Sequence, residues 1–381
     1  PPRSTPLYSS AASDVYKRQT PETVKKFLDL GCKVFFEKGA GKAAGFLDDT
    51  YTDAGAELVE IENDEVKKIV DIVLCVQPPN EKFLSHLKPG SFLVGLLNPY
   101  GNKLLAETLK SKNISAIALE LLPRISRAQS SDALSSQANI AGYKSVLLAA
   151  SALDRYFPML MTAAGTIQPS KIVVLGAGVA GLQAIATAKR LGAVVYVSDI
   201  REAVKEQVES LGARFIELPK IDETPSESGG YAKQVSDEFI IAQRKELAKQ
   251  LSEADVAICT AQVPGKKAPK LIDEKMLDDM RPGSVVIDLA VLSGGNCACS
   301  KPGETIVREG VKIIGASNLP CSIPNHASSL YSRNLLSLLQ PMFKEGKFLI
   351  DNDDELIAGS LISKDGVILK SEIIENGGTR S

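Results

Sequence analysis

Short apolar runs alternate along the chain with longer, mixed segments in which apolar residues recur at three- and four-residue steps. Runs of the first kind are typical of buried strands, and segments of the second kind are typical of amphipathic helices. Strands are predicted near residues 32–36, 57–61, 71–76, 91–97, 114–119, 171–175, 194–198, 213–217, 255–259, 284–289 and 312–315. Strand and helix in alternation predict an α/β fold with doubly wound parallel sheets and helices on both faces.

The two halves of the chain are similar in sequence. Three pairs of similar segments occur in the same order: LGCKVFF from Leu30 and LGAVVYV from Leu191, DIVLCVQPP from Asp71 and DVAICTAQVP from Asp255, KPGSFLVGLL from Lys88 and RPGSVVIDLA from Arg281. The chain is therefore expected to contain two Rossmann-like domains of the same design.

The beginning of the first domain departs from this design. In the second copy a glycine-rich strand and its helix precede Leu191, whereas the corresponding place in the first copy holds PPRSTPLYSS, which has no apolar periodicity. The first domain is therefore expected to lack its opening strand, either because the chain is truncated there or because the domain starts differently. Long helices predicted at 131–154 and 327–339 are expected to join the two domains.

The expected division of the chain follows from these segments. Residues 1–20 are expected to be a disordered or foreign segment and 21–135 the first Rossmann-like domain. Residues 136–325 are expected to form the second Rossmann domain, with 326–381 as a return helix and C-terminal segment that packs on the first.

One motif in the second domain carries chemistry. The segment Gly176-Ala177-Gly178-Val179-Ala180-Gly181 follows an apolar strand and opens a helix that runs to about Leu191. In a dinucleotide-binding turn, the first glycine allows the tight turn, the second lets the backbone approach the pyrophosphate, and the third lets helix and strand pack closely. A similar run of glycines at 39–45 lacks a following helix pattern and an acid-tipped strand, and is predicted to be a loop.

An acid closes the unit. Asp199 lies eighteen residues after Gly181, at the end of the next predicted strand, and is followed by Ile200 and Arg201. A carboxylate there accepts hydrogen bonds from ribose hydroxyls and repels a 2′-phosphate, which favours NAD(H) over NADP(H). Arg201 weakens that preference slightly, because its cationic side chain could bind the 2′-phosphate of NADP(H).

Composition narrows the class of protein. The chain has 381 residues, 44% apolar and 24% charged, which suits two soluble domains and argues against disorder. A formal net charge of −2 gives no basic field for nucleic acid, and no apolar stretch reaches the roughly 18 residues of a spanning helix. Six cysteines without CxxC spacing and two histidines predict no metal site and reduced thiols in a cytosol-like compartment.

Several motifs together resemble one family. ELLPRISRAQSSDALSSQANIAGYKSVLLAASALDRYFPMLMTAAGTI, the glycine unit, KEQVESLGARF, GGYAKQVSDEF, PGKKAP, RPGSVVIDLA, GGNC and LYSRNLL are similar to the NAD(H)-binding component of proton-translocating NAD(P) transhydrogenase, over roughly residues 20–345. The resemblance implies a dimer of two-domain protomers that binds NADH outside the membrane. It also implies direct hydride transfer to NADP+ on an NADP(H)-binding component, coupled to proton movement by a membrane component. The chain would then lie on the cytoplasmic or mitochondrial-matrix side, peripheral to the membrane.

The resemblance also implies the nicotinamide-side residues. The family's loop carries an Arg, a Gln and an Asp followed by a Ser, which correspond to Arg124, Gln129, Asp132 and Ser135 in this sequence. Hydride transfer between two nicotinamides needs close, oriented rings and no general acid or base. Without the resemblance, these four residues are better explained as a helix cap and solvated loop residues.

Further cofactor contacts are expected at loops. The family implies that Tyr231 lies on a loop that closes over the nucleotide. Gln262, Val263 and Pro264 follow one predicted strand and Leu289 ends another, at the edge where α/β sheets bind ligands. The sequence departs from the family at Ala298, where an acid is usual, and at the missing opening strand.

Two other functions remain possible. Alanine dehydrogenase shares this architecture but needs a cationic carboxylate anchor and an ionisable acid/base, and the corresponding stretches VLCVQPP and FLVGLLNPY hold neither the family's Lys nor its His. An NAD-binding module without turnover would serve as a sensor or a subunit. Hydride transfer in the presence of an NADP-binding partner distinguishes a catalyst from such a module, and ammonia-dependent NADH oxidation with pyruvate would indicate an alanine dehydrogenase.

Overall fold

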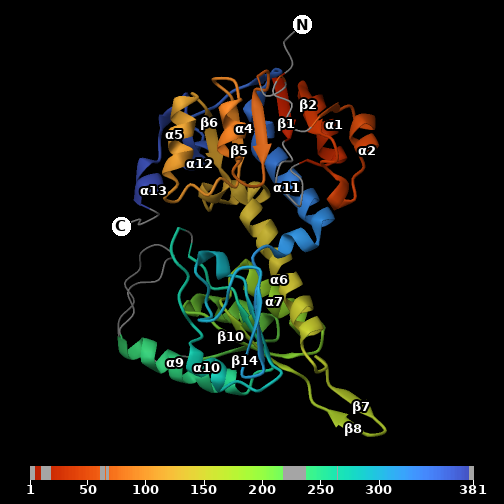
Figure 1. The fold of residues 1–381 in the computed structure, drawn as a ribbon, viewed down its shortest axis with the longest axis vertical. Coiled ribbons are helices and arrows are strands. Elements are labelled where there is room, and N and C mark those ends of the chain that lie inside the picture. Colours follow the sequence, from red (N-terminus) through yellow and green to blue (C-terminus); the bar gives the residue numbers. More distant parts are fainter. Residues whose placement is uncertain are drawn as a thin grey trace. The chain divides into compact units, whose positions relative to one another are not determined.

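The computed structural model describes residues 5–9, 19–60, 65, 68–217, 237–263 and 265–376, with the side chains of 5–9, 237–243, 375 and 376 excepted. The chain divides into two compact units (Figure 1). Unit 1 comprises Pro1–Gln137 and Pro320–Ser381, and unit 2 comprises Ala138–Leu319, so one boundary falls inside helix α6, Ala133–Ala152. The expected boundaries were 135/136 and 325/326.

Unit 1 is built on a mixed sheet. Its strands within the described residues are β1 (Thr5–Ser9), β2 (Cys32–Glu37), β3 (Glu57–Val59), β4 (Ile72–Cys75), β5 (Phe92–Gly95), β6 (Ser115–Ala118), β18 (Leu361–Lys364) and β19 (Val367–Ile368). Their order is β19-β18-β6-β5-β4-β1-β2-β3. Neighbouring strands in the part β6-β5-β4-β1-β2-β3 are parallel. Strand β18 pairs antiparallel with β6, and β19 pairs antiparallel with β18.

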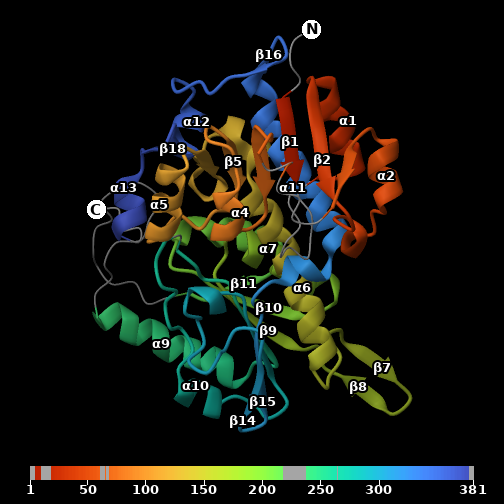
Figure 2. The same ribbon diagram turned by 45° about the horizontal axis from the view of Figure 1, so that its top comes forward.

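The expectation that the first sheet lacks its opening strand is corrected by β1 (Figure 2). This strand pairs in parallel with β2, Thr5 opposite Cys32, and with β4, Leu7 opposite Ile72. Each of those strands has backbone groups on the facing edge that need partners, and the five residues of β1 provide them. Little in the sequence indicates this strand, because Pro6 has no N–H to donate, and proline argues against a central strand.

Helices and short connecting elements complete unit 1. They are α1 (Pro21–Asp29), α2 (Asp48–Asp53), α4 (Glu81–Ser85), α5 (Lys103–Ser111), α11 (Pro324–Leu339), α12 (Glu355–Ser360), α13 (Ser371–Asn376), the 3-10 turns η1 (Lys42–Ala44), η2 (Leu119–Leu121), η3 (Ser126–Ser131), η6 (Leu319–Ser322) and η7 (Gln340–Met342), and the hairpin β16 (Phe343–Lys344) and β17 (Lys347–Phe348). One core cluster packs α4 and α5 against β4, β5 and β6. The glycine run at 39–45 forms turns and η1, as the sequence predicted for a loop.

Unit 2 holds a second sheet. Its strands are β9 (Lys171–Leu175), β10 (Val194–Ser198), β11 (Arg214–Phe215), β12 (Val256–Cys259), β13 (Val285–Asp288), β14 (Thr305–Arg308) and β15 (Val311–Gly315). Their order is β11-β10-β9-β12-β13-β15-β14, parallel except for β14. Its helices and turns are α7 (Val179–Arg190), η4 (Glu202–Val204), α8 (Lys205–Ser210), α9 (Asp237–Ser252), α10 (Glu274–Asp278) and η5 (Val291–Ser293).

Both faces of this sheet are buried. Alternate residues of a strand point to opposite faces, so Ile172 and Val174 lie in one core cluster while Val173 and Leu175 lie in the other. The first cluster also contains side chains of α6, α7 and α8, and the second contains side chains of α9 and α10. The sheet is therefore doubly wound, and the predicted fold class is confirmed.

A hairpin projects from the sheet of unit 2 in both ribbon views (Figures 1 and 2). It consists of β7 (Leu160–Thr162) and β8 (Gly165–Ile167), and Met161 on it is 79% exposed. The sequence analysis placed no strands here, nor at β14, β16, β17, β18 and β19. Every strand that it did predict is present, with ends shifted by a few residues.

Candidate functional site

The glycine loop of unit 2 begins where β9 ends. Gly176 has a φ of +100°, a conformation that L side chains rarely adopt. A Cβ on it would lie 2.8 Å from Thr260 Oγ1 and 3.0 Å from the Ala261 nitrogen, so the end of β12 also excludes a side chain. The chain turns there and enters α7 at Val179.

Gly181 and Gly178, the other two glycines of the motif, differ in what surrounds them. A Cβ on Gly181 would lie 1.9 Å from the Gly176 carbonyl oxygen, so close packing of α7 on the loop requires its absence. A Cβ on Gly178 would meet no atom of the described residues within 4 Å, and its φ of −78° suits any residue. No contact within the described part of unit 2 therefore requires a glycine at this position, and the sequence predicted that its backbone approaches a pyrophosphate.

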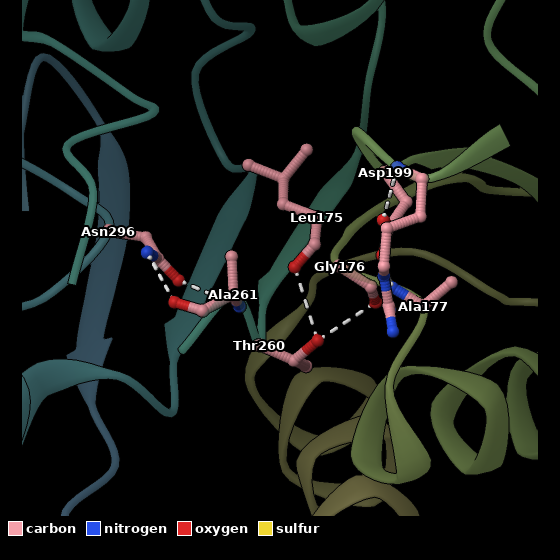
Figure 3. Close-up of polar contacts among 8 residues, drawn as sticks. Leu175, Gly176, Ala177, Asp199, Thr260, Ala261 and Asn296 are labelled. Atoms are coloured by element: carbon pink, nitrogen blue, oxygen red, sulfur yellow. Dashed lines mark hydrogen bonds and ion pairs between the residues drawn. The ribbon is translucent and has the colours of Figure 1, made fainter. Parts of the chain in front are cut away.

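The carboxylate of Asp199 lies beside this loop (Figure 3). Its Oδ2 accepts a hydrogen bond from the Ala177 N–H at 2.7 Å, and the Arg201 guanidinium binds both carboxylate oxygens. Burial alone would raise the pKa of Asp199, but the hydrogen bonds from Arg201 and from the Ala177 amide outweigh it and hold the pKa below its usual range. Asp199 is therefore ionised at neutral pH, and it is hydrogen-bonded to Ala177 within the glycine motif.

Two polar residues that the sequence analysis did not single out hold the neighbouring strand end in place (Figure 3). Thr260 Oγ1 lies 3.1 Å from the Leu175 carbonyl oxygen and 2.9 Å from that of Gly176. Asn296, fully buried, donates to the carbonyl oxygens of Ala261 and Pro269 and accepts from the Ala261 N–H. The sequence offered one signal, because Asn296 belongs to the GGNC segment.

Exposed apolar side chains lie in the segments that carry these polar residues. Val179, which begins α7, is 42% exposed, Ile200, two residues after β10, is 50% exposed, and Val263, four residues after β12, is 36% exposed. Gln262 donates to the Leu289 carbonyl oxygen at 2.8 Å, which joins the ends of β12 and β13. These predicted contacts therefore gather at the carboxyl edge of one sheet, where open α/β sheets bind ligands. Tyr231 and Pro264, also predicted to bind the cofactor, lie outside the described residues.

Ala180 serves helix packing as well. A Cβ on Gly142 of α6 would lie 2.1 Å from the Ala180 carbonyl oxygen, so α6 passes close to the first turn of α7. Asn139 of α6 also donates to Gln183 of α7 at 3.0 Å. The helix that carries the glycine motif is thus fixed on a second side.

The predicted nicotinamide-side residues belong to unit 1, and the glycine loop belongs to unit 2. Asp132 accepts from the Ser135 N–H at 2.9 Å and from the Ser135 hydroxyl at 2.6 Å, so this pair caps the first turn of α6. Arg124 and Gln129 are exposed. In these contacts Asp132 and Ser135 form the helix cap that the sequence alone also allowed.

Other residues of unit 1 hold this loop. Arg127 pairs with Asp354, the N-cap residue of α12, through both carboxylate oxygens. Asn334 of α11 donates to the Ser130 carbonyl oxygen at 2.8 Å and accepts from Ser136 Oγ at 2.7 Å. No local pattern links residues some 200 positions apart, so the sequence could not reveal these contacts.

No metal centre is found in the part of the chain that the structure describes. No three His, Cys, Asp or Glu residues in that part lie close enough to hold a metal ion. Burial raises the pKa of the Cys297 thiol to about 11, so this residue of the Cys297–Cys299 pair stays protonated. Within the same residues, no helix combines the length and apolar character needed to cross a bilayer.

Comparisons with known proteins identify the family of the chain. The models of the alanine dehydrogenase/PNT family match residues 18–141 with its N-terminal domain and residues 145–371 with its C-terminal domain. The chain therefore belongs to the alanine dehydrogenase/PNT family.

Within the family, the chain is similar to transhydrogenases. It is 46% identical to the first part of the alpha subunit of NAD(P) transhydrogenase from Rhodospirillum rubrum over 366 residues, 94% of this chain and 95% of that protein. The solved structure of transhydrogenase from Sinorhizobium meliloti matches with a TM-score of 0.86 at 40% identity, over 96% of this chain and all of that one. Alanine dehydrogenase 1 of Staphylococcus aureus (strain N315) is 27% identical over 89% of this chain and 87% of that protein. The resemblance seen in the sequence is confirmed, and alanine dehydrogenase is the more distant relative.

Proposed function

We propose that this chain is the NAD(H)-binding component of a proton-translocating NAD(P)+ transhydrogenase. The observation that carries the proposal is the open space beside Gly178 among the described residues. Contacts within the chain require glycine at Gly176 and Gly181, whereas no such contact requires it at Gly178. Similarity to transhydrogenase subunits over nearly the whole chain supports the reaction class.

The residues of unit 2 fit the dinucleotide. The N–H groups at the start of α7 are suited to the pyrophosphate, because the N-terminus of a helix attracts anions. Asp199 would bind the adenine ribose and disfavour a 2′-phosphate, so NAD(H) rather than NADP(H) is the proposed cofactor. The exposed faces of Val179, Ile200 and Val263 offer apolar contact to the bases. Tyr231 and Pro264 are retained as proposed contacts.

When bound, NADH supplies a hydride, and the residues of unit 1 would orient the ring that carries it. The exposed amide of Gln129 can both donate to and accept from a carboxamide. Arg124 offers charge for the ribose or pyrophosphate, and the Asp132–Ser135 cap fixes the end of the loop. The hydride would pass directly to NADP+ on a partner, so no acid or base is required.

Three partners follow from this proposal. An NADP(H)-binding component accepts the hydride, and a membrane component couples the transfer to proton movement, which makes this chain peripheral on the cytoplasmic or matrix side. A second copy forms a homodimer. The projecting β7–β8 hairpin supports the dimer, because an apolar side chain as exposed as Met161 is stabilised when a partner covers it.

The test is hydride transfer from NADH to an NADP+ analogue of distinct absorbance, with the purified NADP-binding partner added. The intact chain is expected to catalyse it, while Gly178→Ala should weaken NADH binding at least about tenfold with an unchanged unfolding curve. NADH oxidation by pyruvate and ammonia without a partner would instead indicate an alanine dehydrogenase. Binding of NADH without transfer would indicate a module without turnover.

A further inference from the structure

The carboxylate proposed to bind the adenine ribose is already fully engaged. A carboxylate offers about four acceptor positions, two on each oxygen. Oδ2 accepts from the Ala177 N–H at 2.7 Å and from Arg201 Nη2 at 2.9 Å. Oδ1 accepts from the Arg201 N–H at 2.9 Å and from Arg201 Nε at 3.0 Å. A ribose hydroxyl therefore finds all four positions of Asp199 taken.

Only some of these donors can leave. The N–H groups of Ala177 and Arg201 are backbone, fixed by the glycine turn and by the chain that follows β10. The guanidinium lies at the end of a flexible side chain that is 44% exposed, while the Asp199 side chain is 6% exposed. Arg201 can move into solvent, whereas Asp199 cannot.

The two guanidinium bonds also match what the nucleotide brings. One goes to each carboxylate oxygen, so removal of the guanidinium frees one acceptor position on Oδ1 and one on Oδ2. The adenine ribose carries two neighbouring hydroxyls, each able to donate one hydrogen bond. The two remaining backbone donors keep the carboxylate oriented while the exchange takes place.

We infer that Arg201 is an exchangeable latch on Asp199, displaced by the vicinal diol of the adenine ribose. The inference rests on the proposed function, since it assumes that the dinucleotide binds at this loop. In the free protein the guanidinium satisfies the carboxylate, and on binding the diol takes its place. The latch weakens NADH affinity by the free energy needed to open the ion pair.

The direct test is the affinity of Arg201→Met, which keeps an unbranched side-chain stem and removes the guanidinium donors. NADH, followed by nicotinamide fluorescence, is expected to bind about two- to fivefold more tightly than to the wild type, the scale of a half-exposed ion pair. Arg201→Lys, with one donor group, should fall between. Loss of structure cannot produce tighter binding, so the sign of the change separates a latch from a structural role.

Two controls locate the effect. Lys205→Met removes the same charge four residues away, where the lysine pairs with Glu217 at 2.7 Å, and should not tighten NADH binding. ADP should gain affinity in Arg201→Met by the same factor as NADH. A 2′,3′-dideoxy-ADP probe, which has no diol, should bind both proteins equally.

The outcomes separate the two proposals. If the wild type does not bind NADH, the proposed function fails. If the wild type binds NADH but Arg201→Met binds it equally or more weakly, the latch is wrong and Arg201 is a cofactor ligand or a bystander. Equal tightening of the dideoxy probe would also overturn the latch, because it would reduce the effect to general electrostatics.

Discussion

The two sheets share one design, and their amino ends are nearly the same. The order β3-β2-β1-β4-β5-β6 in unit 1 repeats as β11-β10-β9-β12-β13-β15 in unit 2. Gly90 and Gly283, each before the fifth strand of its set, have φ values of +83° and +87°. Asp71 pairs with Lys88 in the first sheet, and Asp255 pairs with Arg281 in the second. The sequence similarity between the two halves thus corresponds to the same strand order, glycine turn and ion pair at the amino ends of both sheets.

At their carboxyl ends the two sheets differ. In unit 1 the Cys75 carbonyl oxygen accepts from the Tyr331 hydroxyl of α11 at 2.6 Å, and Tyr331 is fully buried. In unit 2 the residue after the corresponding Cys259 is Thr260, which binds the glycine loop. Unit 1 therefore covers this strand end with its own helix, whereas unit 2 uses it to build a loop with open space at Gly178.

A second position shows the same divergence. Gly95 lies opposite Cys75, and Asp288 opposite Cys259. A Cβ on Gly95 would lie 2.1 Å from the Cys75 carbonyl oxygen, so unit 1 allows no side chain. Asp288 in unit 2 is fully buried and accepts from the N–H groups of Ala290 and Cys297. One repeated scaffold thus serves packing in one copy and a structured loop in the other.

The largest expected effect comes from Gly181→Ala. Its Cβ would overlap the Gly176 carbonyl oxygen at 1.9 Å, so α7 must move away from the loop at a cost of about 3 kcal/mol. Thermal unfolding followed with hydrogen exchange should show the loss in unit 2, with unit 1 unchanged, and NADH binding should disappear. Gly178→Ala is the matched control, since it should lose NADH affinity without losing stability. Equal stability of the two variants would contradict the distinction drawn between the glycines.

The next effect is that of Asn296→Leu. The substitution keeps the volume but leaves the Ala261 N–H and the carbonyl oxygens of Ala261 and Pro269 unpaired in a buried site. We expect a loss of about 2–3 kcal/mol and weaker NADH binding, because the segment after β12 is released. Denaturant unfolding measures the loss of stability, and fluorescence titration measures the NADH affinity. Asn139→Leu, at an exposed amide of the same unit, should cost under about 0.5 kcal/mol.

What the sequence could predict follows from the range of each interaction. Alternating apolar runs and the glycine–acid spacing are local, and they predicted most strands of both sheets, the glycine loop and Asp199. Strand β1 was missed because its pairing partners are distant and Pro6 contradicts the local rules. Tyr331 and Asn296 act through backbone atoms far along the chain, so no spacing rule could assign them. The full engagement of Asp199 required the positions of all its donors.

A smaller effect is expected from Tyr331→Phe. It removes one hydroxyl and leaves the Cys75 carbonyl oxygen without that donor, at a cost of about 1 kcal/mol to unit 1. NADH affinity should be unchanged, because Tyr331 is fully buried and is not among the residues proposed to contact NADH. Unfolding curves and NADH titration check both effects. A loss of NADH affinity with retained stability would show that the end of β4, which Tyr331 binds, also takes part in binding.

The smallest effects should come from the repeated ion pair at the amino ends. Lys88→Met removes a half-exposed pair with Asp71 and is expected to cost about 0.5 kcal/mol. Arg281→Met should cost less, because Arg281 lies 3.9 Å from Asp255, while Arg155 at 3.1 Å and the Lys171 N–H at 2.8 Å already bind that carboxylate. Unfolding free energies at low salt and at about 1 M salt measure both, and the Lys88 difference should vanish at high salt. A larger loss for Arg281→Met would mean that the second copy depends on this pair in a way that the first does not.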